Sequence, residues 1–402
     1  MEQSLGDRIV QIRRRRSLTQ AELAEAAGVS LDVITKLEGN RRAGARVSTL
    51  HAIARALKVK TSELLEGGGD LDRADNGDTA NLLALRKILV PSLSQKAARE
   101  APNIANLRAA VTDVTRLYHE SRYQDLLAGI PDTIQDAEAA VAANDGDYKI
   151  IALRLLAQTY NMASLVLLQL RREDLSYEAA RRSMTHAESA GDPILRAAVA
   201  DNIGWIFQRQ ARFDDAEETV ITMADAIEPS WSRANANHIA VWGRLLTRGA
   251  SSAARNNRPE QSREFLSLAR SAAARLGQDH MTYGSYWAAF GPTTVDTIEV
   301  ENAVIMGEPD RALSLARSIR PGGDVRRSTW ARYLLTLADA QAATRNPSEA
   351  VRTLRSAKDY APEWLRYQRL ARRLTQDLLE SQAVRQARNL GLPELAEHMN
   401  IQ

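Results

Sequence analysis

In the first 66 residues, hydrophobic side chains recur every three or four positions, which is the spacing of an amphipathic helix. The first such stretch predicts a helix from about Ser4 to Arg15. Its buried stripe is formed by Leu5, Ile9 and Ile12. A second helix is predicted to begin at Thr19, because Thr19 and Glu22 have the spacing of a capping box, which satisfies the free backbone N–H groups of a helix start. Gly28 ends this helix and supplies a turn.

A third short helix follows this turn, and Ser30 is placed to cap it. Its predicted inward-facing residues are Val33, Ile34 and Leu37. Its predicted outward-facing residues are Leu31, Asp32, Thr35 and Lys36. Two short helices joined by a glycine-containing turn predict a helix-turn-helix, whose second helix has the length that fits a DNA major groove. A helix from Ser48 to Leu57 and a short helix ending at Leu65 close this segment.

The next stretch, Glu66 to Asp78, contains glycine and acidic residues without periodic hydrophobic positions, which predicts a flexible linker. From residue 79 onward every segment has helical periodicity, broken by short turns. We therefore expect an all-α chain with a helix-turn-helix domain at 1–66, a linker at 67–78 and a helical-repeat domain at 79–402.

A weak internal repeat runs through the second half of the chain. Four predicted helices carry a small residue near their fourth position, namely Ala216, Ser262, Ala312 and Ala350. Twelve residues upstream, in the preceding helices, lie Gly204, Ala250, Val300 and Ala338. Small residues at these offsets would let paired helices approach closely and stack as an α-solenoid. An irregular helical bundle is the alternative.

Composition and charge narrow the function classes. The absence of cysteine excludes disulfides, thiolate catalysis and Cys-based zinc sites. We recognise neither an apolar run of about 18 residues nor a signal-peptide core, and therefore expect a cytoplasmic protein. The net charge is +3, with +4 in residues 1–66 and −1 in the remainder, so the basic surplus lies where DNA phosphates are expected. The scarcity of lysine beside arginine indicates a GC-rich genome, such as that of an actinobacterium.

The first 66 residues resemble the XRE/Cro type of helix-turn-helix found in phage repressors. The matching pieces are GDRIVQIRRRR, SLTQAELAEAAGVS, ITKLEGNRR and STLHAIARALKVKTSELL, in this order. The resemblance implies sequence-specific binding to a double-stranded DNA operator. The DNA-contacting residues that it implies are Arg13, Gln20, Ser30, Leu31, Asp32, Thr35, Lys36, Arg41, Arg42 and Arg46. It also implies that Arg13 pairs with Glu38 and touches a phosphate, and that Leu31, Asp32, Thr35 and Lys36 occupy base-reading positions.

Alternatives stay open for several of these residues. The whole segment could be an ordinary four- or five-helix bundle without a ligand. Arg13 to Arg16 could form only a solvated basic helix end, and the arginines after Asn40 only a polar loop. Asp32 either accepts a hydrogen bond from cytosine N4 or complements the positive end of its own helix.

The repeats loosely resemble tetratricopeptide repeats, although their spacing of 38 to 50 residues exceeds the usual length of about 34. In such repeats the first helix of each pair lines the concave face. The residues that this places in a ligand groove are Asn161, Asn202, Trp205, Trp242, Arg244, Arg248, Glu301, Arg332, Thr336 and Asp339. Asparagine could meet a peptide backbone there, and arginine a carboxylate. For each residue a packing or solvated role is the alternative. The aromatic segment from His280 to Thr294 is either groove lining or core.

This domain order resembles the RRNPP-type regulators, in which an XRE domain precedes TPR-like repeats that bind a signalling peptide. We therefore expect a homodimeric transcription regulator whose helical-repeat domain senses a peptide or a small molecule. The alternative is an adaptor that docks a protein partner. The stretch from Trp364 to Ala396 either caps the array or forms the dimer interface.

Enzyme activity is not expected. The six histidines are scattered singly, and none has the spacing of a metal-binding motif. The sequence contains no phosphate-binding, dinucleotide-binding or nucleophile-elbow motif. We therefore expect neither a catalytic site nor a metal or other cofactor.

Overall fold

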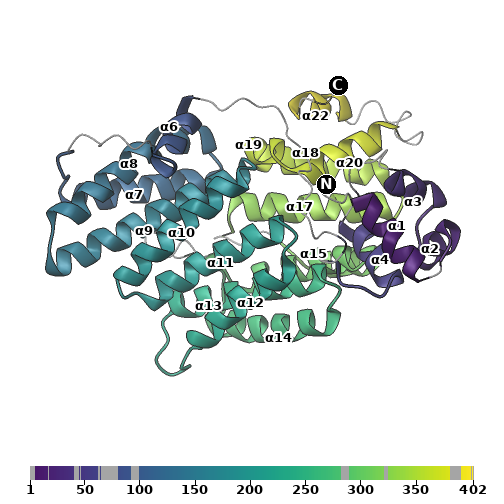
Figure 1. The fold of residues 1–402 in the computed structure, drawn as a ribbon, viewed down its shortest axis with the longest axis horizontal. Helices are drawn as coiled ribbons and strands as arrows, with labels where there is room; N and C mark the ends of the chain where they lie inside the picture. The colour runs from purple at the N-terminus through teal and green to yellow at the C-terminus, as the bar shows by residue number, and fades with distance from the viewer. Residues whose placement is uncertain are drawn as a thin grey trace.

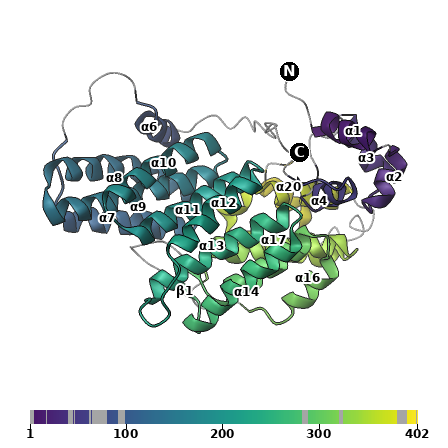
Figure 2. The same cartoon turned by 60° about the horizontal axis from the view of Figure 1, so that its bottom comes forward.

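The computed structural model describes residues 5–16, 18–39, 45, 47–61, 64, 80–91, 99–281, 289–320, 325–380, 391–399 and 401. The described residues are helical apart from turns and one pair of two-residue strands, so the expected all-α fold class is confirmed. A small N-terminal domain lies at one end of a long body of antiparallel helices (Figures 1 and 2). The predicted linker at 67–78 lies outside the described residues.

The N-terminal domain is built from α1 (Leu5–Arg15), α2 (Gln20–Ala26), α3 (Leu31–Glu38) and α4 (Val47–Ala56). Its core contains the fully buried side chains Ile9, Leu23, Ile34, Leu37, Ile53, Leu57 and Leu64. The predicted capping box is confirmed, since Thr19 Oγ1 accepts from the backbone N–H of Glu22 at 3.2 Å and Thr19 N donates to Glu22 Oε2 at 2.7 Å. The predicted cap at Ser30 is not made. Ser30 occupies the position before α3 in an extended conformation, but its hydroxyl makes no capping hydrogen bond.

Six consecutive helical pairs form the body, preceded by α6 (Ala80–Leu89). The pairs are α7 (Ile104–His119) with α8 (Tyr123–Ala143), α9 (Gly146–Gln169) with α10 (Glu173–Ser189), α11 (Pro193–Arg209) with α12 (Phe213–Ala226), α13 (Ala236–Arg255) with α14 (Pro259–Leu276), α15 (Pro292–Ile305) with α16 (Pro309–Ala316), and α17 (Arg327–Ala343) with α18 (Pro347–Tyr360). Each helix contacts the next, and the first helices also contact one another in series from α7 to α17. This nearest-neighbour stacking is that of a solenoid. The irregular bundle is therefore excluded.

The turn inside each pair repeats the same backbone conformation. The second residue after each first helix has a positive φ, and these residues are Ser121, Arg171, Ala211, Asn257, Gly307 and Arg345. One further residue then precedes the second helix in every pair. The two earliest pairs, whose sequences fit the repeat poorly, therefore belong to the same series as the other four.

Small side chains set the distance between paired helices, as their spacing predicts. The eight residues at these offsets are all buried, and all except Val300 are small. At Gly204, an added Cβ would lie 2.4 Å from Val220 Cγ1 of α12, closer than any real side chain allows. The absence of a side chain at Gly204 thus permits the contact between α11 and α12.

The C-terminal helices close the array. The helices α19 (Pro362–Arg366), α20 (Arg369–Glu380) and α22 (Leu392–His398) pack against α18, and α20 also contacts α17. The carboxylate of Glu363 accepts hydrogen bonds from the backbone N–H groups of Tyr123 at 3.0 Å and Gln124 at 3.1 Å. The last helices therefore return to the start of α8, and the first helices surround a central groove. For the described residues this supports the capping interpretation of the C-terminal stretch.

Contrary to the expectation from the sequence, α9 is long and apolar enough to resemble a membrane span. Its most apolar window of 18 residues has a mean hydropathy of 1.4. However, 83% of that window is buried inside the helical body. The central position of α9 between neighbouring pairs accounts for this composition, because a helix surrounded by protein is apolar on every side.

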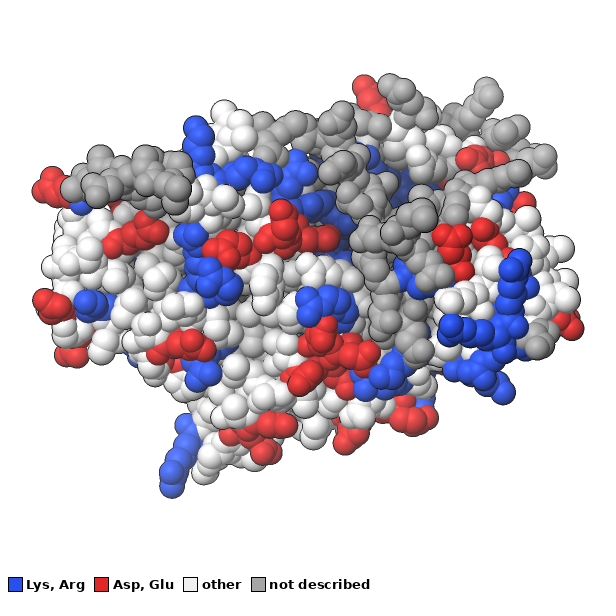
Figure 3. All heavy atoms as spheres, in the orientation of Figure 1, with Lys and Arg blue, Asp and Glu red and all other residues white. Residues whose placement is uncertain are grey.

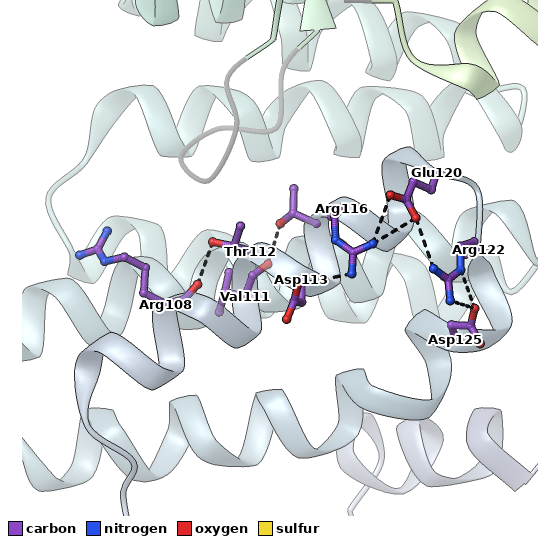
Figure 4. Close-up of polar contacts among 9 residues, drawn as sticks. Arg108, Val111, Thr112, Asp113, Arg116, Glu120, Arg122 and Asp125 are labelled. Carbon is purple, nitrogen blue, oxygen red and sulfur yellow. Dashed lines mark hydrogen bonds and ion pairs between the residues drawn. The ribbon is translucent and has the colours of Figure 1, made fainter.

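The outer surface carries short-range ion pairs. On α7 and the following turn, Arg116 pairs with Asp113 and Glu120, and Arg122 pairs with Glu120 and Asp125 (Figure 4). These side chains are well exposed, so solvent screening leaves each pair with little effect on stability. Arg116 is consequently a suitable site for control substitutions.

Candidate functional site

The helix α3 presents its predicted face to solvent. Leu31, Asp32, Thr35 and Lys36 are all exposed, whereas Ile34 and Leu37 are buried. Leu31 is 49% exposed, whereas the other apolar side chains of α3 are buried or partly buried. Lys36 Nζ lies 2.8 Å from Asp32 Oδ2. In the free protein Asp32 therefore partly neutralises Lys36, a role that differs from both of its predicted ones.

Behind this face, Arg13 and Gln20 converge on Glu38. Arg13 donates from Nε to Glu38 Oε1 at 2.6 Å and from Nη2 to Oε2 at 2.7 Å, and Gln20 Nε2 donates to the same Oε2 at 2.7 Å. The expected pairing of Arg13 with Glu38 is thus confirmed. Burial opposes ionisation of Glu38, but the hydrogen bonds from Arg13 and Gln20 nevertheless lower its pKa. The side chain expected to touch a phosphate therefore also joins α1 to the end of α3.

The other implied phosphate contacts, Arg41, Arg42 and Arg46, lie outside the described residues. Lys and Arg side chains gather over α1 and α4 at the end of the molecule (Figure 3). The basic surplus of residues 1–66 is therefore presented at least partly as a continuous surface, as phosphate binding requires.

A groove that is partly open to solvent lies between the first helices of the repeats. Its lining residues are Tyr118, Gln169, Trp205, Arg244, Arg248, Ala289, Thr294, Thr297, Ile298, Glu301, Arg326, Ser328, Thr329, Arg332, Tyr333 and Trp364. Five of the ten predicted ligand residues are among them, namely Trp205, Arg244, Arg248, Glu301 and Arg332. They come from α11, α13, α15 and α17, so residues distant in the sequence meet at one site.

Asn161 and Asn202 do not line this groove, which corrects their predicted place. They are 0% and 1% exposed, and Asn202 Nδ2 donates to Asn161 Oδ1 and to Ser164 Oγ, both at 2.8 Å. Ser164 in turn lies 3.1 Å from Ser176 Oγ of α10. These residues form a buried network that joins α9, α10 and α11, in which Asn161 Nδ2 and Asn202 Oδ1 have no hydrogen-bond partner among the described residues.

Trp242, Thr336 and Asp339 are also absent from the groove lining. Trp242 is 5% exposed and packs edge-to-face against Trp231, with ring centroids 5.7 Å apart. Thr336 and Asp339 are 6% and 7% exposed, and lie further along α17 than its groove-lining residues. The repeat register predicted that these residues line the groove, but they are buried and do not appear among the residues of this groove.

Three guanidinium groups surround the ring of Trp205: those of Arg248 and Arg332, which line the groove, and that of Arg209, which lies behind the lining residues. The Cζ atoms of Arg209, Arg248 and Arg332 lie 5.7, 5.3 and 5.4 Å from its centroid. We call these four residues the Trp205 cluster. Burial lowers the pKa of Arg209 to about 9 and that of Arg248 to about 10. Because arginine stays protonated in proteins, these shifts express the energetic cost of holding positive charge there.

Two buried carboxylates balance part of this charge. Asp201 accepts from Arg244 at 3.1 Å and from Arg248 at 3.0 Å. Glu301 pairs with Arg255 and lies 3.5 Å from Arg332. Burial opposes ionisation of both acids, but these arginines nevertheless lower their pKa values.

Sequence reasoning missed Gln169 and Arg209, although a signal existed. Gln169 and Arg209 lie five positions after Ser164 and Gly204, the small residues of α9 and α11. The prediction considered only positions beside or before the small residue of each first helix. It therefore left out the helical turn that follows this residue. By contrast, Trp364 of the C-terminal helix α19 reaches the groove through the closure of the array, which no repeat register encodes.

Of the predicted aromatic segment, residues 282–288 lie outside the described residues. Its flanks form the strands β1 (His280–Met281) and β2 (Ala289–Phe290), which pair antiparallel. Ala289 and Thr294 line the groove, whereas Phe290 is 1% exposed and belongs to the core. Ala289 and Thr294 therefore fit the groove-lining interpretation of this segment, and Phe290 fits the core interpretation.

The helix α15 connects the groove with the N-terminal domain. It supplies Thr294, Thr297, Ile298 and Glu301 to the groove, and it contacts α4. A second contact between the domains joins Lys60 Nζ to Asp214 Oδ1 at 3.2 Å. Asp214 also accepts a hydrogen bond from Asn256 at 2.9 Å, at the end of α13.

In the described part of the chain, no group of three or more His, Asp or Glu side chains could hold a metal ion.

Comparison with known proteins found a match to one domain model and a match to a solved structure. Residues 8–67 match the model of the Cro/C1-type HTH DNA-binding domain. Among curated proteins, none matches the sequence. One of the solved structures that match is that of Bacillus thuringiensis PlcR in complex with the peptide PapR7 and DNA, at 13% identity and a TM-score of 0.35, covering 78% of this chain and 94% of that chain. A likeness this distant assigns no ligand. The chain thus carries a Cro/C1-type helix-turn-helix DNA-binding domain at its N-terminus, followed by a body of helical repeats.

Proposed function

We propose that this chain is a sequence-specific transcription regulator whose helical-repeat domain senses a ligand in the central groove and transmits its presence to the DNA-binding domain. One observation carries the proposal. The helix α15 lines the groove and also contacts α4 of the helix-turn-helix domain. A ligand that shifts α15 therefore changes the surface on which the DNA-binding domain rests. We retain 1–66, 67–78 and 79–402 as the proposed domain boundaries.

For DNA recognition we propose that α3 enters the major groove. Lys36 would donate to guanine, Leu31 would contact a thymine methyl group, and Ser30 and Thr35 would add hydroxyl contacts. Opening of the exposed pair between Asp32 and Lys36 frees both side chains for bases. Arg13 and Gln20 would contact phosphates with the N–H groups that Glu38 leaves free.

Selection of bound genomic fragments, followed by anisotropy titration at several salt concentrations, tests this interface. If Lys36 reads a base, Lys36→Met should weaken binding to the selected site by about 1–3 kcal/mol and relax its sequence preference. If Lys36 contacts a phosphate, the salt slope should instead fall by about 1. Arg116→Met on α7 is the matched control and should change neither quantity. Unchanged affinity, preference and salt slope for Lys36→Met would remove α3 as the recognition helix.

For sensing we propose a peptide or small molecule as the ligand and a homodimer as the assembled state. If two copies bind half-sites one helical turn apart, roughly 34–36 Å, DNA affinity depends on the position in which the repeats hold each DNA-binding domain. The ligand must bind one arrangement of α15 and α4 more tightly than another, because equal affinity shifts no equilibrium. A protein that reads an operator acts where the DNA is, so we propose the cytoplasm as its location.

The alternative function, an adaptor for a protein partner, would call for a large apolar groove that accommodates a helix. The described groove is instead lined by four arginines, a glutamate and several hydroxyl groups. This lining favours a polar ligand. We also propose that the chain is not an enzyme and needs no cofactor, since the groove combines no nucleophile and base in hydrogen-bonding contact.

The absence of cysteine makes the coupling directly measurable. Glu25→Cys on α2 and Glu260→Cys on α14 introduce two exposed labelling sites, one in each domain. Spin-label distances in the full chain should change when operator DNA binds and when ligands from a peptide and metabolite screen bind. A distance distribution unaffected by every ligand that binds the groove would refute the sensing proposal and leave the DNA-binding proposal standing.

A further inference from the structure

We infer that the central groove binds an oxyanion carrying at least two negative charges, a phosphate ester or a pair of carboxylates, seated on the arginines of the Trp205 cluster. This inference specifies the ligand class of the sensing groove and so rests on the proposed function. Nothing in the match to the DNA-binding family bears on it, because that match ends at residue 67.

The first observation is an excess of positive charge. Four arginines line the groove against one acid, Glu301. That acid is already shared between Arg255 and Arg332, and the nearby Asp201 is shared between Arg244 and Arg248. These two carboxylates thus serve the three lining residues Arg244, Arg248 and Arg332 and also Arg255, which does not line the groove. A cavity lined by one sign of charge in a region of low dielectric concentrates counter-ions of the opposite sign.

The second observation is the state of Arg209. In the described part of the chain its Nε and Nη2 are buried and have no hydrogen-bond partner. Its guanidinium lies over the ring of Trp205, and the charges of Arg171 and Arg332 add to the burial that lowers its pKa, against the opposing charge of Glu173. A buried guanidinium with unused donors is costly unless something accepts from it. An oxyanion between Arg209, Arg248 and Arg332 would accept from donors on all three.

The third observation describes the rest of the ligand. Gln169 lines the groove at 2% exposure, and its Oε1 finds no partner among the described residues, while its Nε2 donates to Tyr118 Oη at 3.3 Å. Whichever way this amide is oriented, one polar end stays available to a ligand. Trp205, which is 9% exposed, also lines the groove. The ligand therefore combines an oxyanion with a small body that makes one further hydrogen bond.

Calorimetry on the full-length protein with three probes tests the inference and separates the two sources of charge. The probes are inorganic phosphate, the peptide acid acetyl-Asp-Phe, which carries two carboxylates, and the same peptide as its C-terminal amide, all against sodium chloride at equal ionic strength. Phosphate or the peptide acid should bind, and the amide should bind at least tenfold more weakly than the acid. A phosphate response alone identifies a phosphate-bearing ligand, and a response to the acid alone identifies carboxylates.

Two variants complete the test. Arg209→Gln and Arg332→Gln should each weaken the responding probe at least tenfold, whereas Arg116→Gln on the outer surface should leave it unchanged. Removing an unpaired buried charge relieves repulsion, so Arg209→Gln should also fold and should melt no lower than the wild type. Equal heats for phosphate and chloride together with no heat for the peptide acid, or unchanged binding in both groove variants, would overturn the inference. Anion binding that leaves DNA affinity unchanged would uphold this site and overturn the sensing function instead.

Discussion

Replacing Arg13 with methionine should destabilise the N-terminal domain without touching the repeats. The guanidinium group makes two hydrogen bonds of 2.6 and 2.7 Å to Glu38 and one of 2.8 Å to the carbonyl oxygen of Leu18. The side chain of Glu38 is 3% exposed, so Arg13→Met leaves a buried carboxylate with Gln20 as its one remaining described side-chain partner. Breaking one half of a buried pair costs about 3–5 kcal/mol.

Residues 1–66 contain no Phe, Trp or Tyr, so fluorescence does not report on this domain. Hydrogen exchange of the α2 and α3 backbone amides measures its opening free energy inside the full chain. At about 1.4 kcal/mol per factor of ten, protection should fall between about a hundredfold and several thousandfold. The amides of α9, in the core of the repeats, are the internal control and should keep their protection.

The double variant Arg13→Met with Glu38→Met separates structure from DNA contact. Replacing both partners with apolar groups leaves no unpaired buried charge. The double variant should therefore recover most of the lost stability of the N-terminal domain and lie within about 1 kcal/mol of the wild type. If Arg13 also contacts a phosphate, the double variant should still bind DNA with a salt slope reduced by about 0.9. A single variant that loses less than about 1 kcal/mol, or a double variant no more stable than the single one, would show that the pair contributes little.

Three further changes have expected outcomes. Gly204→Ala should cost about 1–3 kcal/mol in urea unfolding, because its Cβ would lie 2.4 Å from Val220, whereas Gly129→Ala, which meets nothing within 4 Å, should not destabilise; equal effects would contradict the packing argument. Burial lowers the pKa of His51 to about 4, so lowering the pH from 6.5 to 5.5 should cost about 1 kcal/mol of N-terminal domain stability as the unfolded chain takes up the proton. His51→Leu should abolish this slope, and an unchanged slope in hydrogen exchange would assign it to other groups. Gly307→Ala should cost roughly 1–2 kcal/mol at a φ of 80°, measured by urea unfolding, and a neutral effect would show that this turn tolerates a side chain as its five counterparts do.

Local patterns in the sequence determined the elements and their faces. The capping box at Thr19 and the spacing of Ile34 and Leu37 fixed where α2 begins and which side of α3 is buried, because both depend on residues three or four positions apart. Likewise, the small residues Gly204 and Ala216 identified the paired helices, since close packing imposes a requirement on composition. These constraints act within one helix or one pair, so a single sequence can express them.

Only the tertiary structure decided which buried polar residues meet a ligand groove. Asn202 and Trp205 stand one turn apart on α11, yet Asn202 is fixed by Asn161 and Ser164, while Trp205 faces the groove. The position of the groove depends on how far each helical pair is rotated against the next and on where the array closes, at Glu363. Each rotation depends on small packing differences, and these accumulate over about 240 residues of chain between Tyr123 and Glu363. No local sequence pattern encodes the accumulated rotation.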